Sequence, residues 1–254
     1  MIASSTVAAE VATSGFMQGD GKRREYYELR RYQFLSGPHV NLAHDYFREA
    51  LVPALNRLGI RLVGVFNLTI GPEAPSVYLL MPCSSLDTLI AVDSALDRDA
   101  AYLKAGDAFL NAPARDPAYV RVDSSLLLAF EGMPLLAVPA AEKRPRMFEL
   151  RTYESPSDQD HKRKVEEFNS GEMDSFRKAG FWGVFFASSL IGSRLPNLTY
   201  MLGFNDLADR DRKWDAFRAE PGWTKLNAST RYTFEAIVSN TTNTILTATP
   251  YSQI

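Results

Sequence analysis

Two short segments of the chain alternate, residue by residue, between side chains of different character. The segment YELRRY at residues 27–32 and the segment FELRTY at 148–153 both follow this period of two, which is typical of a β-strand with two distinct faces. An apolar stripe with helical spacing follows each strand and ends at Gly59 in one case and at Gly180 in the other. Because glycine commonly ends a helix, each strand is predicted to lead into a helix.

The two segments belong to a longer internal repeat. At an offset of 121 residues, Phe47 corresponds to Phe168 and Pro75 corresponds to Pro196. Self-similarity over such a distance predicts two related structural units. It also allows the two halves to be compared position by position, so that a feature present in only one half can be recognised.

Further strands complete each predicted unit. The expected ranges are 61–69 and 182–190 for the second strand, 76–81 and 198–204 for the third, and 124–130 and 232–238 for the fourth. With a second helix before the fourth strand, each half has the order β-α-β-β-α-β, which is the ferredoxin-like unit. Tyr78 matches Tyr200 only at an offset of 122, which predicts a one-residue slip in the turn before the third strand.

The two halves are predicted to differ in length. The residues DPAY at 116–119 resemble EPGW at 220–223 at an offset of only 104, so the first half is expected to carry 17 extra residues in an insertion near 87–116. The chain then divides into a flexible N-terminal tail, a first repeat, a proline-containing linker and a second repeat. Their predicted ranges are 1–24, 25–131, 132–146 and 147–254.

A ferredoxin-like sheet carries helices on one face only, so its other face needs a cover. We predict an α+β fold in which two tandem ferredoxin-like repeats pack sheet to sheet as an intrachain α+β barrel, because two separate domains would each expose an apolar sheet face. On the first strand of each half, Tyr27, Leu29, Phe148 and Leu150 form an apolar face suited to packing under the helices. The opposite, charged face is then expected to look into the barrel.

Several short motifs resemble those of the NIPSNAP family. They are the Glu-Leu-Arg-x-Tyr opening of both halves, FNSGE at 168–172, VFF at 184–186, LPNLTY at 195–200 and the tryptophan-containing run from Trp214 to Trp223. The resemblance covers the chain from about residue 25 onward and is stronger in the second half. It implies a dimeric α+β barrel fold and little about function, since related barrels include oxygenases, haem enzymes and simple binding proteins.

Composition and charge narrow the range of partners. The net charge of −2 gives no basic footprint for nucleic acid and no polybasic membrane patch, and no apolar run is long enough for a membrane span. The single Cys83 excludes an intramolecular disulfide and a cysteine-rich metal cluster. None of the three histidines has metal-ligand spacing. We therefore expect neither a metal nor a cofactor.

The N-terminal residues do not identify the cellular compartment of the protein. Residues 1–21 are small and polar, without the charged start and sustained apolar core of a signal peptide. This slightly favours a cytoplasmic protein with a mobile tail. The alternative is an exported bacterial precursor that lacks its leader.

The charged faces of the two repeated strands contain most of the candidate site residues. One interpretation is that their glutamate and arginine side chains form cross-strand ion pairs that close the interface between the halves. The other is a polar-walled cavity in which an arginine binds an anionic group and a tyrosine orients it. These residues are Glu28, Arg30 and Tyr32 in the first half and Glu149, Arg151 and Tyr153 in the second.

Two further candidates belong to the second half. Glu172 corresponds to Leu51, on what should be a buried helical stripe. A bend could expose this carboxyl group or an arginine could pair with it; alternatively, it is a partly buried general base with a raised pKa. Tyr200 belongs to an aromatic-rich set that either packs in the core or lines an apolar pocket.

Two functions follow from these features. The first is a binding or scaffold barrel for a small hydrophobic or anionic ligand, which could also form a homo-oligomer. The second is a cofactor-independent, oxygenase-like or isomerase-like enzyme that acts on a small hydrophobic substrate in the barrel. There an arginine would bind an oxyanion and a glutamate or tyrosine would move a proton. The barrel interior would separate the two: a closed interior filled by side chains would argue against the enzyme, whereas a cavity of at least about 300 Å³ touching an arginine would support it.

Overall fold

A computed structural model describes residues 23–138 and 147–254. Most of the predicted tail (1–24), and residues 139–146 of the predicted linker, lie outside the described residues. The first half contains β1 (Tyr26–Gln33), α1 (Gly37–Tyr46), the π-helical turn η1 (Phe47–Leu51), α2 (Val52–Arg57), β2 (Gly64–Ile70), β3 (Ser76–Cys83), α3 (Leu86–Leu96), α4 (Ala100–Leu110) and β4 (Arg121–Ala129). The second half contains β5 (Met147–Glu154), α5 (Asp158–Glu167), the π-helical turn η2 (Phe168–Glu172), α6 (Met173–Lys178), β6 (Trp182–Ile191), β7 (Asn197–Phe204), α7 (Leu207–Arg218), α8 (Pro221–Asn227), the 3₁₀ turn η3 (Thr230–Tyr232), α9 (Phe234–Ile237) and β8 (Asn240–Ala248).

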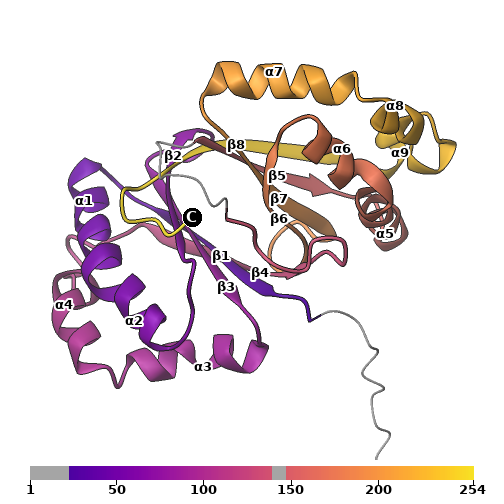
Figure 1. Cartoon of the computed structure of the whole chain (residues 1–254). Helices are drawn as coiled ribbons and strands as arrows, with labels where there is room; N and C mark the ends of the chain where they lie inside the picture. Colours follow the sequence, from indigo (N-terminus) through magenta and orange to yellow (C-terminus); the bar gives the residue numbers. More distant parts are fainter. Residues whose placement is uncertain (1–22, 139–146) are drawn as a thin grey trace, which may run out of the picture.

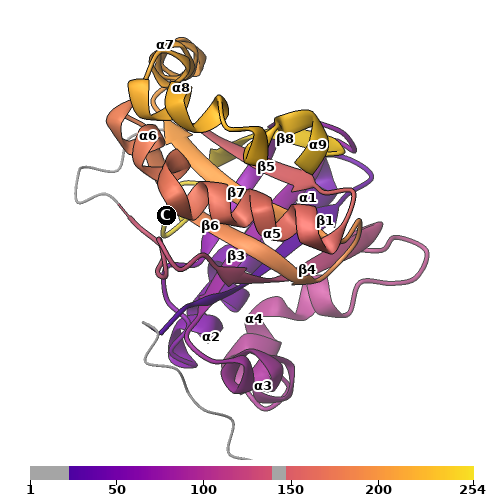
Figure 2. The same cartoon turned by 90° about the vertical axis from the view of Figure 1, so that its right-hand side faces the viewer.

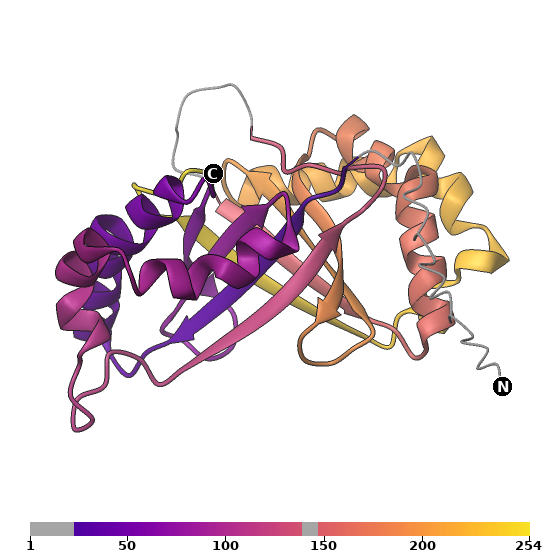
Figure 3. The same ribbon diagram turned by 90° about the horizontal axis from the view of Figure 1, so that it is seen from below.

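The strands of both halves close into one barrel, in the order β1-β3-β2-β8-β5-β7-β6-β4 (Figure 1). The two halves join through hydrogen-bonded strand pairs, because β8 pairs with β2 and β4 pairs with β6. Helices α1–α4 lie on one side of the strands and α5–α9 on the other, as Figures 2 and 3 show. Closure leaves no open sheet edge in the barrel, and the predicted intrachain α+β barrel is confirmed.

The barrel interior is apolar, and the predicted orientation of the first strands is wrong. Tyr27 meets Phe185 of the other half with ring centroids 5.1 Å apart, and Phe66 meets Phe148 at 5.0 Å. Tyr27, Phe148 and Leu150 therefore face the barrel core, whereas the charged alternate positions face the helices. The physical reason is that charged groups can find partners on the polar helices, while closing the barrel requires large apolar side chains from both sheets.

The fourth strand of the second half is also not where the sequence pattern placed it. Residues 232–238 form the end of η3 and helix α9, with Tyr232 and Ile237 buried, and β8 follows at Asn240–Ala248. This strand contains four threonines, and its polar, β-branched residues suit a strand without forming an apolar run. The apolar segment before it packs instead in the core between the sheet and the helices of the second half.

Correcting this strand removes the predicted difference in length. The first and fourth strands begin at residues 26 and 121 in the first half and at 147 and 240 in the second, intervals of 95 and 93 residues. The expected 17-residue insertion is therefore wrong, since the two proline-containing motifs that suggested it are not equivalent positions. The predicted slip is wrong too: β3 and β7 keep the offset of 121, so that Arg30 pairs with Leu79 as Arg151 pairs with Tyr200.

Candidate functional site

A cavity of about 570 Å³ lies between the sheet and the helices of the second half. Its wall combines residues of β5, α5, η2 and the helices α7, α8 and α9. Four of its charged side chains are Arg151, Lys164, Glu172 and Arg210, and its aromatic side chains are Tyr153, Trp214, Phe217, Trp223 and Phe234. Thus the predicted candidates Arg151, Tyr153 and Glu172 meet in one cavity, outside the barrel rather than inside it.

Arg151 is the cation on the sheet side of this cavity. Its Nη1 donates to Glu149 at 2.9 Å and its Nη2 donates to the Tyr153 hydroxyl at 2.9 Å. The guanidinium carbon lies 4.6 Å from the ring centre of Trp214, a cation–π distance. Its Nε is buried and has no hydrogen-bond partner among the described residues. The guanidinium is thus held on both Nη atoms, while its Nε has no partner among the described residues.

Glu149 fixes Arg151 from behind. Its carboxylate is fully buried and also accepts two hydrogen bonds from Arg210, at 2.7 and 2.9 Å, and one from the Trp214 indole at 3.1 Å. Burial raises the pKa of Glu149, but the hydrogen bonds and charges of the two arginines outweigh it and keep the pKa below its usual value. One carboxylate therefore serves two guanidinium groups, and Asp211 supplies a second negative charge 3.0 Å from Arg210 Nη1.

A buried lysine with two carboxylates forms the opposite wall. Lys164 Nζ lies 2.7 Å from Glu167 Oε2 and 2.9 Å from Glu172 Oε2, and all three side chains are at most 3% exposed. Burial lowers the pKa of Lys164, but the charges of Glu172 and Glu167 raise it overall. Burial raises the pKa of Glu172, and burial together with the charge of Glu172 raises that of Glu167 to about 7.

The turn η2 brings Glu172 into this wall. At Gly171 the backbone takes φ 157° and ψ −18°, which is not helical and which an L side chain rarely adopts. The chain resumes a helix at Met173, so the carboxylate eight residues after Lys164 reaches back to its ammonium group. The bend that the sequence suggested for Glu172 is present, yet it buries the carboxyl group rather than exposing it.

Tyr200 supports the site from below without lining the cavity. Its hydroxyl lies 2.8 Å from that of Tyr153, which in turn accepts the hydrogen bond from Arg151. The side chain is fully buried, and this burial raises its pKa well above the ordinary value. Tyr200 thus holds Tyr153 in position, and among the predicted candidates it acts through its neighbour.

The equivalent region of the first half is packed differently. Arg30 bonds Glu28 at 2.5 and 3.1 Å, and Tyr32 is buried in an aromatic cluster. Above them Tyr46 stacks on Phe109 with centroids 4.2 Å apart. The ion pairs at Arg30 and at Arg151 each lie within one half and under its helices, so the interpretation that they close the interface between the halves is wrong.

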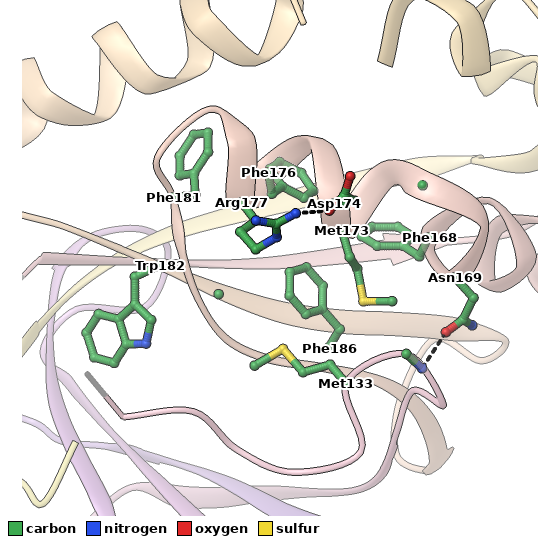
Figure 4. A pocket seen from close by; sticks show the side chains of 13 residues that line it. Met133, Phe168, Asn169, Met173, Asp174, Phe176, Arg177, Phe181, Trp182 and Phe186 are labelled. Atoms are coloured by element: carbon green, nitrogen blue, oxygen red, sulfur yellow. Dashed lines mark hydrogen bonds and ion pairs between the residues drawn. The ribbon is translucent and has the colours of Figure 1, made fainter. Parts of the chain in front are cut away.

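A second cavity, of about 470 Å³, lies on the other side of η2 (Figure 4). Its wall is largely aromatic and methionine-rich, with Phe186, Met133 and Met173 pointing into it. The charged pair shown there, Arg177 and Asp174, is exposed at the rim. This cavity lacks a buried charged group among its described lining residues, so the first cavity is the stronger candidate for recognition of a polar ligand.

Comparison of the two halves could have revealed Lys164, which sequence reasoning missed. Ala43, Phe47 and Leu51 of the first half correspond to Lys164, Phe168 and Glu172 of the second. The comparison that identified Glu172 as unusual thus also identifies Lys164, because a lysine stands where the first half has an alanine. The charged residues around it in α5 made Lys164 look like an ordinary surface lysine. Arg210 carries no such signal, because an arginine in a polar helix is normally solvated.

Within the described parts of the chain, no group of three or more His, Cys, Asp or Glu residues could hold a metal ion. No helix there is long and apolar enough to cross a membrane.

The sequence model of the NIPSNAP family matches residues 27–131 and 148–253 of this chain. The chain belongs to the NIPSNAP family. Each of the two matched ranges coincides with one half of the barrel. The resemblance seen in the sequence motifs is therefore confirmed. No curated protein shows significant sequence similarity to this NIPSNAP chain.

Solved structures similar to this NIPSNAP protein share its fold at very low identity. A candidate monooxygenase from Fusobacterium nucleatum is 8% identical, with a TM-score of 0.55 over 89% of this chain and 92% of that one. A candidate monooxygenase from Lactobacillus acidophilus is 6% identical, with a TM-score of 0.55 over 89% and 94%. A chlorite dismutase variant from Candidatus Nitrospira defluvii is 10% identical, with a TM-score of 0.50 over 89% and 92%. These similarities show the barrel fold.

Proposed function

We propose that this NIPSNAP protein binds a small molecule with a flat apolar body and an anionic oxygen group in the cavity of its second half. The observation that supports this most directly is Arg151. Its guanidinium lines a cavity of about 570 Å³, and its Nε has no hydrogen-bond partner among the described residues. A volume above about 300 Å³ is typical of small-molecule sites. Arginine suits a carboxylate or similar oxyanion because its planar donors match two oxygens.

The aromatic wall supplies the other half of the recognition. Trp214, Trp223 and Phe234 line the same cavity from three different helices. Aromatic faces bind flat apolar groups by stacking and edge contacts, each contributing about 0.5–1.5 kcal/mol beyond burial of area. A ligand with its oxyanion on Arg151 would lay its ring system against these side chains.

Native mass spectrometry of protein purified from its source would test this proposal. A retained small molecule is expected in the wild type, and it should be lost in Arg151→Ala and kept in the matched first-half variant Arg30→Ala. Loss in both variants, or in neither, would contradict a site at Arg151. The same spectra measure the oligomeric state, for which a homo-oligomer stays a prediction.

A second candidate function is supported by one specific contact. Glu172 lines the cavity and is paired with Lys164, so a proton acceptor faces the same cavity as the proposed oxyanion site. That arrangement suits a cofactor-independent, isomerase-like enzyme that removes a proton next to a carbonyl group. Exchange of the C3 protons of phenylpyruvate in D₂O, followed by NMR, measures this step. Exchange that is faster with wild type than with Glu172→Gln is expected for an enzyme; equal rates would contradict it.

A further inference from the structure

The cluster of Lys164, Glu167 and Glu172 contains two acids and one base in a nearly dry environment. All three side chains are at most 3% exposed. With every group ionised, the cluster would hold an unbalanced negative charge, which is costly to bury. A proton bound to one carboxyl group removes that charge. The geometry alone therefore creates a place where one proton is shared between two glutamates.

Lys164 keeps its proton and stays positively charged. Its ammonium lies 4.9 Å from the ring centre of Phe168, 5.5 Å from that of Tyr153 and 5.6 Å from that of Phe234. Aromatic faces stabilise a cation, and two carboxylates accept hydrogen bonds from the same nitrogen. The proton that moves with pH is thus on the glutamates.

We propose that the second-half cavity binds an anion together with one proton, which the Glu167–Glu172 pair takes up. This rests on the proposed function. Glu172 lines the same cavity as Arg151, so an anion bound there repels its carboxylate and favours its protonated form. A neutral Glu172 also gains an O–H that can donate to the ligand.

Several other charged groups surround Glu172 and define the controls. The sheet contributes Arg151 and, through buried hydroxyls, Tyr153 and Tyr200, while α7 contributes Arg210, Asp211, Asp215 and Arg218 at the cavity. Glu166 of α5 points elsewhere, accepting from Arg231 at 2.9 Å and from Tyr232 at 2.8 Å. His161 of α5 bonds Ser188 at 3.1 Å and does not line the cavity.

The direction of the pH dependence follows from the pKa shifts. Burial raises the pKa of Glu167 to about 7, and it raises that of Glu172 as well. Below that pH the Glu167–Glu172 pair already holds its proton, so an incoming anion is not repelled by a second carboxylate. Above that pH the pair must take up a proton from solvent when the anion binds. Affinity for an anion is therefore highest in acid and falls as the pH rises through about 7.

The probe for the experiment is 8-anilinonaphthalene-1-sulfonate, a fluorescent aromatic anion whose sulfonate stays ionised throughout. Its Kd for the full chain is expected to rise about five- to tenfold from pH 6 to pH 8, as uptake of one proton requires. Glu172→Gln, which imitates the neutral form, should keep a nearly constant Kd close to the wild-type value at pH 6. The controls Glu166→Gln and His161→Gln should retain the wild-type pH dependence.

Two further variants separate the possible failures. Arg151→Ala is expected to weaken binding about tenfold or more at every pH, because a charge-assisted hydrogen bond is lost. Met133→Ala, which alters only the second cavity, should bind as wild type does. A wild-type Kd that is constant from pH 6 to pH 8, with binding still dependent on Arg151, would overturn the proton coupling and leave the proposed function standing. Binding that is insensitive to Arg151→Ala would overturn both.

Calorimetry provides a readout that needs no substitution in the cluster. Titration of the wild type with the same probe at pH 7.5, in phosphate and in Tris, which differ in their heats of ionisation, counts the protons exchanged. Uptake of roughly half a proton to one proton per bound anion is expected. No net exchange would contradict the proposal even if Glu172→Gln failed to fold.

Discussion

The two halves of this barrel differ most at positions that should be equivalent. In the first half, Ala43 and Leu51 are buried in an apolar core beneath Tyr46 and Phe109. In the second half, a lysine and a glutamate occupy the corresponding positions. Both halves keep the same first strand and the same helix with a π-helical turn after it. The comparison teaches that the same framework can hold an apolar helix–sheet core in one copy and a charged cavity in the other.

The largest effect is expected from removing the central cation. Lys164→Ala should lower the free energy of unfolding by about 3–5 kcal/mol, because two buried carboxylates lose their partner. Urea unfolding followed by circular dichroism measures this.

The matched control for that variant carries the residues of the first half. In the triple variant Lys164→Ala, Glu167→Tyr and Glu172→Leu, no buried charge is left without a partner. At least half of the lost stability should return, while anion binding stays absent. A triple variant no more stable than Lys164→Ala would show that the two halves pack too differently for this exchange.

The next effect tests how tightly the helices of the first half pack on its sheet. Tyr102 of α4 is 6% exposed and its hydroxyl lies 2.8 Å from that of Tyr46. Tyr102→Ala should lower the free energy of unfolding by about 3 kcal/mol, because it leaves a cavity in a packed core. Phe234→Ala, at the partly exposed edge of the second-half cavity, should lower the free energy of unfolding by about 1 kcal/mol or less. Equal costs in chemical denaturation would contradict the view that the first half is the packed one.

A moderate effect is expected on the pH dependence of stability. Since the folded protein holds a proton on the Glu167–Glu172 pair up to pH of about 7, while an unfolded glutamate loses it near pH 4.3, stability falls as the pH rises between these values. The slope from this one proton is at most about 1.4 kcal/mol per pH unit. Unfolding of wild type and of Glu172→Gln at pH 5, 6, 7 and 8 should show a shallower slope in the variant; parallel curves would contradict it.

The smallest effect is expected at the exposed end of the first-half ion pair. Asp93 of α3 corresponds to Trp214 of α7, and its carboxylate is 3.8 Å from Arg30 with the side chain 83% exposed. Asp93→Ala should change the free energy of unfolding by no more than about 0.5 kcal/mol, because solvent screens such a pair. A loss above 1 kcal/mol in urea titrations would mean that the first half depends on this pair as the second depends on its charges.

The comparison of repeats predicted much of this molecule. The alternation at 27–32 and 148–153 located β1 and β5, and the duplication led to the closed barrel. Glu172 was found because it stood opposite Leu51. The same comparison was sufficient for Lys164. Arg210 and Phe234 could not be found this way, since their importance lies only in which side chains the fold places beside them.

Two predictions were wrong because a local sequence pattern does not determine which partners a strand meets in the folded protein. An alternating strand has two faces, and the pattern does not say which one a barrel will enclose. The barrel enclosed Tyr27 and Phe148, and the charged face lies under the helices. The second error was to assign the apolar run at 232–238 to a strand, although the threonine-rich segment after it was available to pair with β2 and β5.

The sequence by itself determined that the protein is a tandem repeat of one α+β unit, since periodicity and duplication are properties of the chain alone. It also determined that the second half is the unusual one. Only the tertiary structure decided where the charges go, because the cost of a buried carboxylate depends on its neighbours in space. Folding brought Lys164, Glu167 and Glu172 together across a π-helical turn and placed Arg151 opposite them on the same cavity.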